Sequence, residues 1–155
     1  MESIRILQEH DGLKKSQIVA DVLSDLPEWF GLPESTQAYI EEARNLLLWY
    51  VDRDGEIFGF LTLTSTSVDT AEVHCMGVKK ALHRTGLGTL LYTEAENFAR
   101  DEYKYIQVKT VDEGHYKEYD QTISFYKEMG FSKLEVFPTL WDPWNPCLVM
   151  VKALR

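Results

Sequence analysis

The residues best suited to do chemistry are concentrated in residues 71–91, which read AEVHCMGVKKALHRTGLGTLL. Ala71–Val78 has the alternating pattern of a strand, and leucines spaced by three and four predict a helix at the end of the stretch. Between them lies the basic loop Lys79–Gly88, which contains two glycines. A glycine-rich turn at the start of a helix presents unpaired backbone N–H groups at the positive end of the helix dipole. The stretch therefore predicts a phosphate-binding site.

Two nucleotide-binding fingerprints can be tested against these letters, and both fail. A Rossmann fingerprint requires a third glycine at the position of Leu91. A P-loop ends in Gly-Lys-Ser/Thr, but here Gly88 is followed by Thr89 and Leu90. What remains is Arg-Thr-Gly-Leu-Gly at the start of a helix, after a strand that ends in Gly-Val.

This remainder resembles motif A of the GNAT superfamily of N-acetyltransferases, Arg/Gln-x-x-Gly-x-Gly/Ala, whose loop amides hold the pyrophosphate of acetyl-coenzyme A. His83 stands at the first position of the motif, and Arg84 can supply the charge. Ile123–Phe131, ISFYKEMGF, resembles motif B of the same family, a helix with an aromatic pair followed by Gly-Phe. Many members carry an Asn seven residues before the Tyr. Here that position is Tyr119, in what we expect to be a long charged loop, 111–121.

Three side chains are candidates for the catalytic roles that acyl transfer requires. Glu72 resembles the strand glutamate that acts as the base in the histone-acetylating branch of the family; otherwise it is an ordinary strand residue. His74 is the second candidate, as a base or relay, and its alternative is a structural histidine. Tyr126 resembles the family residue that protonates the leaving thiolate, and its alternative is a core aromatic.

The resemblance also implies which residues bind the two substrates. The candidates for acetyl-coenzyme A are Met76, Gly77, Val78, Arg84, Thr85, Gly86, Leu87, Gly88, Thr89 and Tyr126. In the resembling fold, the segments Asp25–Pro33 and Pro138–Pro146 flank the acceptor pocket. The acceptor candidates in them are Glu28, Trp29, Phe30, Trp141 and Trp144. Aromatic rings near carboxylates suit a cation or amine, whereas tryptophans also serve to pack loops down.

Length and composition predict one domain over residues 1–155. We expect no transmembrane helix and no signal peptide. Cys75 and Cys147 lack metal-site spacing, which favours no metal and a reduced, cytoplasmic compartment. The net charge of −9 argues against nucleic acid and is compatible with an amine substrate. A membrane partner is not expected, and a homodimer is compatible with the sequence.

The order of elements predicts an α/β fold with a mixed, mostly antiparallel central sheet flanked by helices, as in the GNAT acyl-CoA N-acyltransferase fold. The expected strands are Ser3–Gln8, Leu46–Val51, Glu56–Thr64, Ala71–Val78, Tyr105–Val111, Phe131–Val136 and Cys147–Ala153. The expected helices are Lys14–Leu23, Glu34–Ala43, the one that ends near Arg100, and Gln121–Met129. The leading hypothesis is an acetyl-CoA-dependent N-acetyltransferase for a small amine. The alternatives are acetylation of a protein N-terminus or lysine, and a non-catalytic acyl-CoA-binding sensor or structural domain.

Overall fold

The structure is a computed structural model that describes residues 3–155, and its chain forms two compact units. The first unit contains the residues up to Thr64 together with His74–Phe98, and the second contains Ser65–Val73 and Ala99–Arg155. The helices of the described chain are α1 (Gly12–Ser24), α2 (Pro33–Glu42), α3 (Leu87–Glu102) and α4 (Lys117–Glu128), with short 3₁₀ turns at Ala43–Asn45 and Lys80–Leu82. The strands are β1 (Ile4–Glu9), β2 (Leu47–Arg53), β3 (Glu56–Ser65), β4 (Thr70–Val78), β5 (Tyr105–Val111), β6 (Ser132–Asp142) and β7 (Asn145–Ala153). Among residues 3–155, no helix is long and apolar enough to cross a bilayer.

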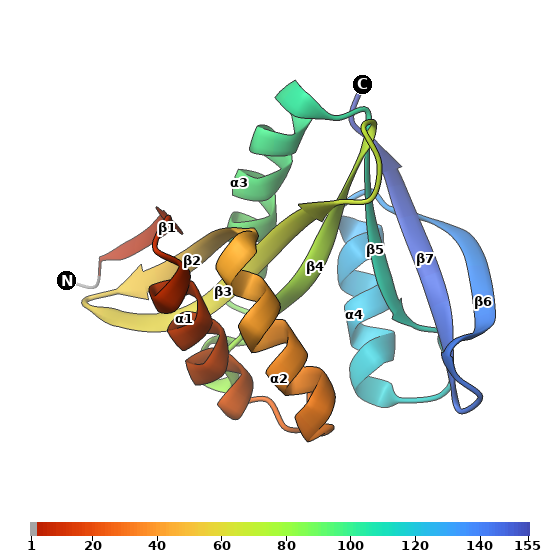
Figure 1. Ribbon diagram of the computed structural model, residues 1–155, viewed down its shortest axis with the longest axis horizontal. Helices are drawn as coiled ribbons and strands as arrows, with labels where there is room; N and C mark the ends of the chain where they lie inside the picture. Colours follow the sequence, from red (N-terminus) through yellow and green to blue (C-terminus); the bar gives the residue numbers. More distant parts are fainter. Residues whose placement is uncertain (1–2) are drawn as a thin grey trace. The chain divides into compact units, whose positions relative to one another are not determined.

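The strands of the described residues hydrogen-bond in the order β1-β2-β3-β4-β5-β7-β6 (Figure 1). The pairs β1–β2, β2–β3, β5–β7 and β6–β7 are antiparallel, whereas β4 and β5 are parallel. The strand β4 contributes to both units, because Thr70–Val73 belongs to the second and the rest of the strand to the first. The predicted fold class, a mixed sheet flanked by helices, is confirmed.

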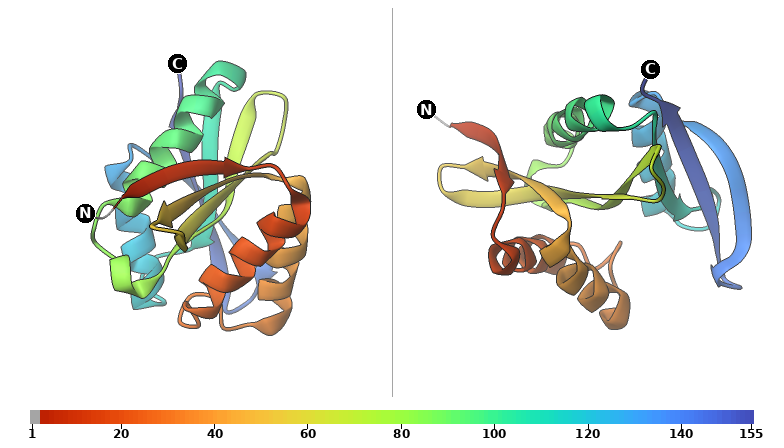
Figure 2. Two further views of the ribbon diagram at one scale, coloured as in Figure 1. Left: turned by 90° about the vertical axis from the view of Figure 1, so that its left-hand side faces the viewer. Right: turned by 45° about the horizontal axis from the view of Figure 1, so that its top comes forward.

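The first unit is built on the helix pair α1 and α2, which lie side by side on one face of β2, β3 and β4, with α3 on the other face (Figure 2). The helix α1 begins after Asp11, whose carboxylate accepts a hydrogen bond from the backbone N–H of Lys14 at 2.9 Å. Its apolar side chains recur at helical spacing and form one core cluster with residues of the sheet. The members of that cluster are Ile18, Val19, Val22, Leu23, Leu26, Ala43, Leu48, Phe60 and Cys75.

Two glycines of this unit have positions that only glycine fits well. Gly55 follows Asp54 in the turn between β2 and β3, and both have positive φ, 90° and 52° respectively. Such a two-residue turn matches the twist of the strands that it joins. On β4, a Cβ atom at Gly77 would lie 2.9 Å from Cδ1 of Leu26. Gly77 thus allows Leu26, which follows α1, to pack closely against β4.

The second unit places α4 beside β5, with β7 and the edge strand β6 beyond it. The helix α4 ends in a Schellman motif. The N–H of Gly130 donates to the carbonyl of Lys127, and the N–H of Phe131 donates to the carbonyl of Tyr126. Gly130 has φ 100°, a backbone conformation that favours glycine.

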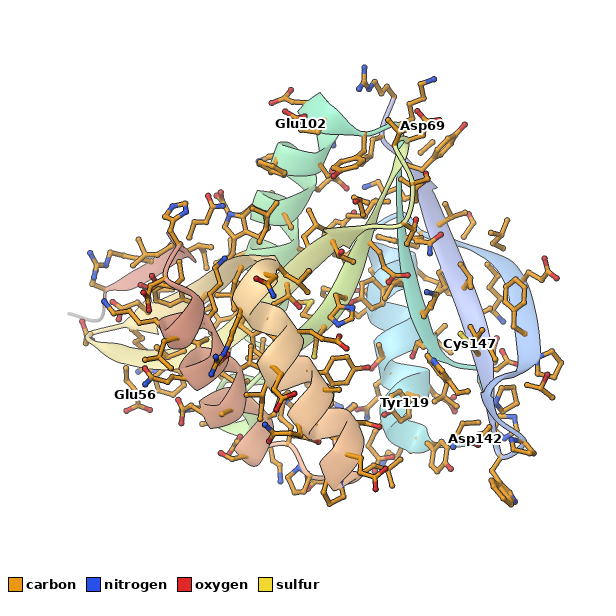
Figure 3. The ribbon with its side chains drawn as sticks, in the orientation of Figure 1. Glu56, Asp69, Glu102, Tyr119, Asp142 and Cys147 are labelled. Carbon is orange, nitrogen blue, oxygen red and sulfur yellow. The ribbon has the colours of Figure 1, made fainter. Side chains whose placement is uncertain are left out.

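Two elements of this unit extend further than the sequence predicts. The helix α4 begins at Lys117 rather than Gln121, so Tyr119 lies in its first turn and not in a long loop (Figure 3). Glu118 and Asp120 in that turn favour a helix start because of the helix dipole. The strand β6 continues to Asp142, and a strand rather than a loop therefore occupies most of Pro138–Pro146. Proline is tolerated there because β6 is an edge strand.

Candidate active site

The predicted phosphate loop has the backbone that an anion site requires. Arg84 and Gly86 have positive φ, 62° and 87°, and α3 begins at the next residue, Leu87. No heavy atom lies within 4 Å of the place where a Cβ on Gly86 would stand. The N–H groups of the first helical turn have no acceptor within the helix, and they form the positive end of its dipole. The loop thus has the backbone of an anion-binding turn, and its role toward the pyrophosphate of acetyl-coenzyme A stays a prediction.

The two lysines at the start of this loop are paired with carboxylates of the α1–α2 region. Lys79 Nζ lies 2.9 Å from Asp21 Oδ2, and Lys80 Nζ lies 2.6 Å from Glu28 Oε2. The backbone N–H of Lys80 also donates to Asp25 Oδ2 at 2.7 Å. The hydrogen bond from Lys80 lowers the pKa of the Glu28 carboxyl below its ordinary value. These contacts join the start of the loop to the helical region.

Of the other basic residues in the loop, His83 is also engaged. Its Nε2 donates to the backbone carbonyl of Val78 at 2.5 Å, and the ring of Trp29 meets it edge-on, with 5.5 Å between centroids. Arg84 has no carboxylate partner among residues 3–155. The loop therefore offers a ligand the charge of Arg84 and the amides of the helix start. Whether Arg84 supplies the charge that His83 does not stays a prediction.

The acceptor candidates of the Asp25–Pro33 segment are partly used in packing. Trp29 and Phe30 pack against the core cluster of the first unit, and Phe30 also meets Tyr39 edge-on, at 5.9 Å between centroids. Both aromatic side chains remain half-buried rather than enclosed. Glu28, which precedes them, connects this segment to the start of the loop through its ion pair with Lys80.

His74 on β4 is paired with a carboxylate that sequence reasoning did not find. Its Nε2 lies 2.6 Å from Glu42 Oε2 at the end of α2, and the imidazole meets Tyr39 edge-on, at 5.4 Å between centroids. The His74 side chain is 23% exposed and that of Glu42 is 53% exposed. Met76, two residues further along β4, is also half-buried. A carboxylate–imidazole pair of this kind can accept and hold a proton.

Glu72 has different surroundings in the second unit. Gln107 Nε2 donates to its Oε1 at 2.9 Å, and Lys109 Nζ lies 3.2 Å from the same oxygen. The Glu72 side chain is only 9% exposed. Both partners are on β5, which pairs with this part of β4 in parallel register. These contacts favour a structural ion pair, and the role of Glu72 as a base stays a prediction.

Tyr126 is buried at the end of α4, where it is part of the Schellman motif described above. Its ring meets those of Phe125 and Phe131 edge-on, each at 5.2 Å between centroids. The contact with Phe131 is the apolar contact that accompanies such caps. The Tyr-x-x-x-Gly-Phe pattern therefore has a structural explanation of its own. The role of the Tyr126 hydroxyl toward a thiolate stays a prediction.

The two tryptophan candidates near the C-terminus lie on the β6–β7 hairpin. Trp141 is on β6, and Trp144, which is 76% exposed, lies in the turn between the strands. Asp142 Oδ1 accepts hydrogen bonds from the N–H groups of Trp144 and Asn145, each at 2.9 Å (Figure 3). A further bond from the Asn145 side chain lowers the pKa of the Asp142 carboxyl. Asp142 is thus used to shape the turn.

Sequence reasoning missed two polar residues. Glu42 gave no signal because its partner is 32 positions away and on a different element. Thr110 on β5 is buried, and its Oγ1 has no hydrogen-bond partner among residues 3–155. A buried hydroxyl without a partner is rare in proteins, and a ligand or water could satisfy it. No pattern in the sequence distinguishes Thr110 from the other small polar residues of a strand.

The predicted residues fall into two groups, one in each unit. The first unit contains His74, Met76, Gly77, Val78, the loop Arg84–Thr89, and the acceptor candidates Glu28, Trp29 and Phe30. The second unit contains Glu72, Tyr126, Trp141 and Trp144. Among residues 3–155, no group of three or more His, Cys, Asp or Glu side chains is arranged to hold a metal ion.

Comparison with known protein families matches residues 17–131 to the "Acetyltransferase (GNAT) family". This match covers more than half of the chain, and the protein therefore belongs to the GNAT family of acetyltransferases. Comparison with curated protein sequences found no match.

Solved structures of the same fold agree with this assignment. A GNAT-family protein from Desulfovibrio desulfuricans is similar with a TM-score of 0.86 and 15% identity, over 99% of this chain and 100% of that one. The aminoglycoside 6'-N-acetyltransferase from Enterococcus faecium is similar with a TM-score of 0.75 and 18% identity, over 99% and 97% of the two chains. A GNAT-family acetyltransferase from Elizabethkingia anophelis, solved with acetyl-CoA bound, has a TM-score of 0.72 and 16% identity, over 97% of each chain. At these identities the likeness establishes the fold.

Proposed function

We propose that this protein is an N-acetyltransferase that transfers the acetyl group of acetyl-coenzyme A to the amine of a small molecule. The observation that carries the proposal is the loop before α3, with its positive φ angles at Arg84 and Gly86 and open space above the glycine. In the reaction, the acyl carbon–sulfur bond breaks and a carbon–nitrogen bond forms. The amine loses a proton, and the coenzyme A sulfur gains one.

The chain offers a residue for each of these demands. We propose that the amides of the helix start and Arg84 bind the pyrophosphate, and that the backbone of Met76–Val78 binds the pantetheine arm. An amine is mostly protonated near neutral pH and must lose a proton before it attacks. His74 is half-buried and paired with Glu42, whereas Glu72 is enclosed by Lys109 and Gln107. We therefore favour His74 over Glu72 as the base.

The remaining roles follow the family pattern. The Tyr126 hydroxyl is proposed to protonate the thiolate as it leaves. We propose Glu28, Trp29 and Phe30, with Trp141 and Trp144, as contacts of the acceptor. A small amine is favoured by the acidic net charge of −9, and the aminoglycoside acetyltransferases of the same fold act on small-molecule amines.

The test is a thiol-release assay with acetyl-coenzyme A and a panel of aminoglycosides, polyamines, amino acids and peptides. The proposal expects release of coenzyme A with at least one small amine and formation of an acetylated product. Activity with peptides alone would favour acetylation of a protein N-terminus or lysine. Binding of coenzyme A with no turnover on any member of the panel would favour a sensor.

A further inference from the structure

We infer that Glu42 is a positioning residue for acetyl transfer, which fixes the tautomer and orientation of His74 so that Nδ1 is the nitrogen that receives the amine proton. The inference rests on the proposed function, since it assigns the base of that reaction. It adds a residue from α2 that no motif of the sequence indicates, and it gives the two nitrogens of His74 separate tasks.

The tautomer follows from the chemistry of the pair. An ionised carboxylate can only accept hydrogen bonds, and Glu42 Oε2 lies 2.6 Å from His74 Nε2. Nε2 must therefore carry the hydrogen. In a neutral imidazole with a hydrogen on Nε2, the other nitrogen, Nδ1, has the free lone pair. The contact thus decides which nitrogen can act as the base.

The ring is also held from the side. Tyr39 meets the imidazole edge-on, and Phe30 meets Tyr39 edge-on in turn, at 5.4 and 5.9 Å between centroids. Tyr39 and Phe30 both pack against the core cluster of the first unit. A side chain held by a hydrogen bond at one atom and by packing along one edge has few rotamers available. A base with one orientation is what a transfer between fixed partners requires.

The position of Glu42 in α2 also supports a positioning role. It is the last residue of the helix, Glu41 precedes it, and the last turn contains no basic residue. A carboxylate at this end is disfavoured by the helix dipole. Glu41 accepts a hydrogen bond from Gln37 on the helix surface, whereas Glu42 reaches across to β4. Functional sites are where such local rules are expected to be broken, and Glu42 reaches a candidate base.

The alternative is that the pair only holds α2 against β4. Kinetic measurements distinguish this structural role from a positioning role. The variants are Glu42→Gln, Glu41→Gln as a matched control on the same turn, His74→Gln, and the double variant. We expect kcat to fall about tenfold or more in Glu42→Gln, while the affinity for coenzyme A is unchanged. Glu41→Gln should match the wild type. In the double variant, Glu42→Gln should add nothing to the loss caused by His74→Gln.

The tautomer itself is read by ¹⁵N NMR of histidine-labelled protein, with the His74 signals assigned by their loss in His74→Gln. We expect the Nε2–H form in the wild type at a pH where the ring is neutral, and loss of this preference in Glu42→Gln. A purely structural pair would lower thermal stability in Glu42→Gln and leave kcat unchanged.

An active wild type whose kcat is unaffected by Glu42→Gln, or an Nδ1–H form of His74, would overturn the role of Glu42 alone. A wild type that releases no thiol with any amine of the panel would instead overturn the proposed function.

Discussion

Replacing Gly86 with valine should abolish the stabilisation of this protein by coenzyme A. Ligand at 100 times its dissociation constant stabilises the folded state by about 2.7 kcal/mol. For a chain of this size, 1 kcal/mol corresponds to about 2–4 °C in melting temperature, so the wild type should gain roughly 5–11 °C. Valine at φ 87° is strained by about 1–2 kcal/mol even though no heavy atom stands near its Cβ. Its branched side chain would also fill the space through which a phosphate approaches the amides of the helix start.

The matched control for this experiment is Gly114→Val. Gly114 has φ 90°, and nothing lies within 4 Å of the place of its Cβ, as at Gly86, but it lies in the segment between β5 and α4. Because the backbone strain is about the same at the two positions, both variants should melt a few degrees below the wild type. Melting curves by differential scanning fluorimetry, with and without coenzyme A, should show the ligand shift in Gly114→Val and none in Gly86→Val. A full shift in Gly86→Val would refute the assignment of the loop.

Three further predictions follow from single contacts. Tyr126→Phe keeps the ring contact with Phe131 and should lower kcat about tenfold or more, by steady-state kinetics; an unchanged kcat would make Tyr126 a cap residue only. Gly77→Ala brings a methyl group to 2.9 Å from Leu26 Cδ1, and urea unfolding should show that the free energy of unfolding falls by about 1–3 kcal/mol; an unchanged value would mean that the Leu26 side chain shifts without cost. Burial raises the pKa of the Cys147 thiol to about 11. Because the folded pKa is the higher one, this thiol stabilises the fold below its unfolded pKa of about 8.5–9 and loses that contribution as the pH rises to about 11. Iodoacetamide should modify Cys147 slowly at pH 8, and rapid modification of the folded protein would contradict its burial.

The sequence is most informative where local chemistry determines the backbone. The Asp54-Gly55 turn, the start of α3 after Gly86 and the cap at Gly130 are predictable because only glycine or a similar residue tolerates positive φ. The helix α1 is also predictable, because the spacing of its apolar residues matches its buried face. The two family motifs fall at the start of α3 and at the helix that ends before Gly130.

The parts that could not be predicted depend on contacts between distant residues. In the sequence, Lys79 and Lys80 make the start of the loop basic. In the structure, Asp21 and Glu28 pair with them, although these carboxylates are more than fifty positions away in the sequence. The pairing of His74 with Glu42 is equally invisible in a single chain. The continuation of β6 through Pro138 depends on its place at the sheet edge, which is a property of the whole sheet.

The most direct test of the central claim is to follow acetyl transfer by the wild-type protein, with free thiol and acetylated amine measured in the same reaction. We predict that one small amine of the panel yields thiol and acetylated product in equal amounts, and that Gly86→Val yields neither. Thiol release without any acetylated amine, or no release with any acceptor, would contradict the claim that this chain is an N-acetyltransferase.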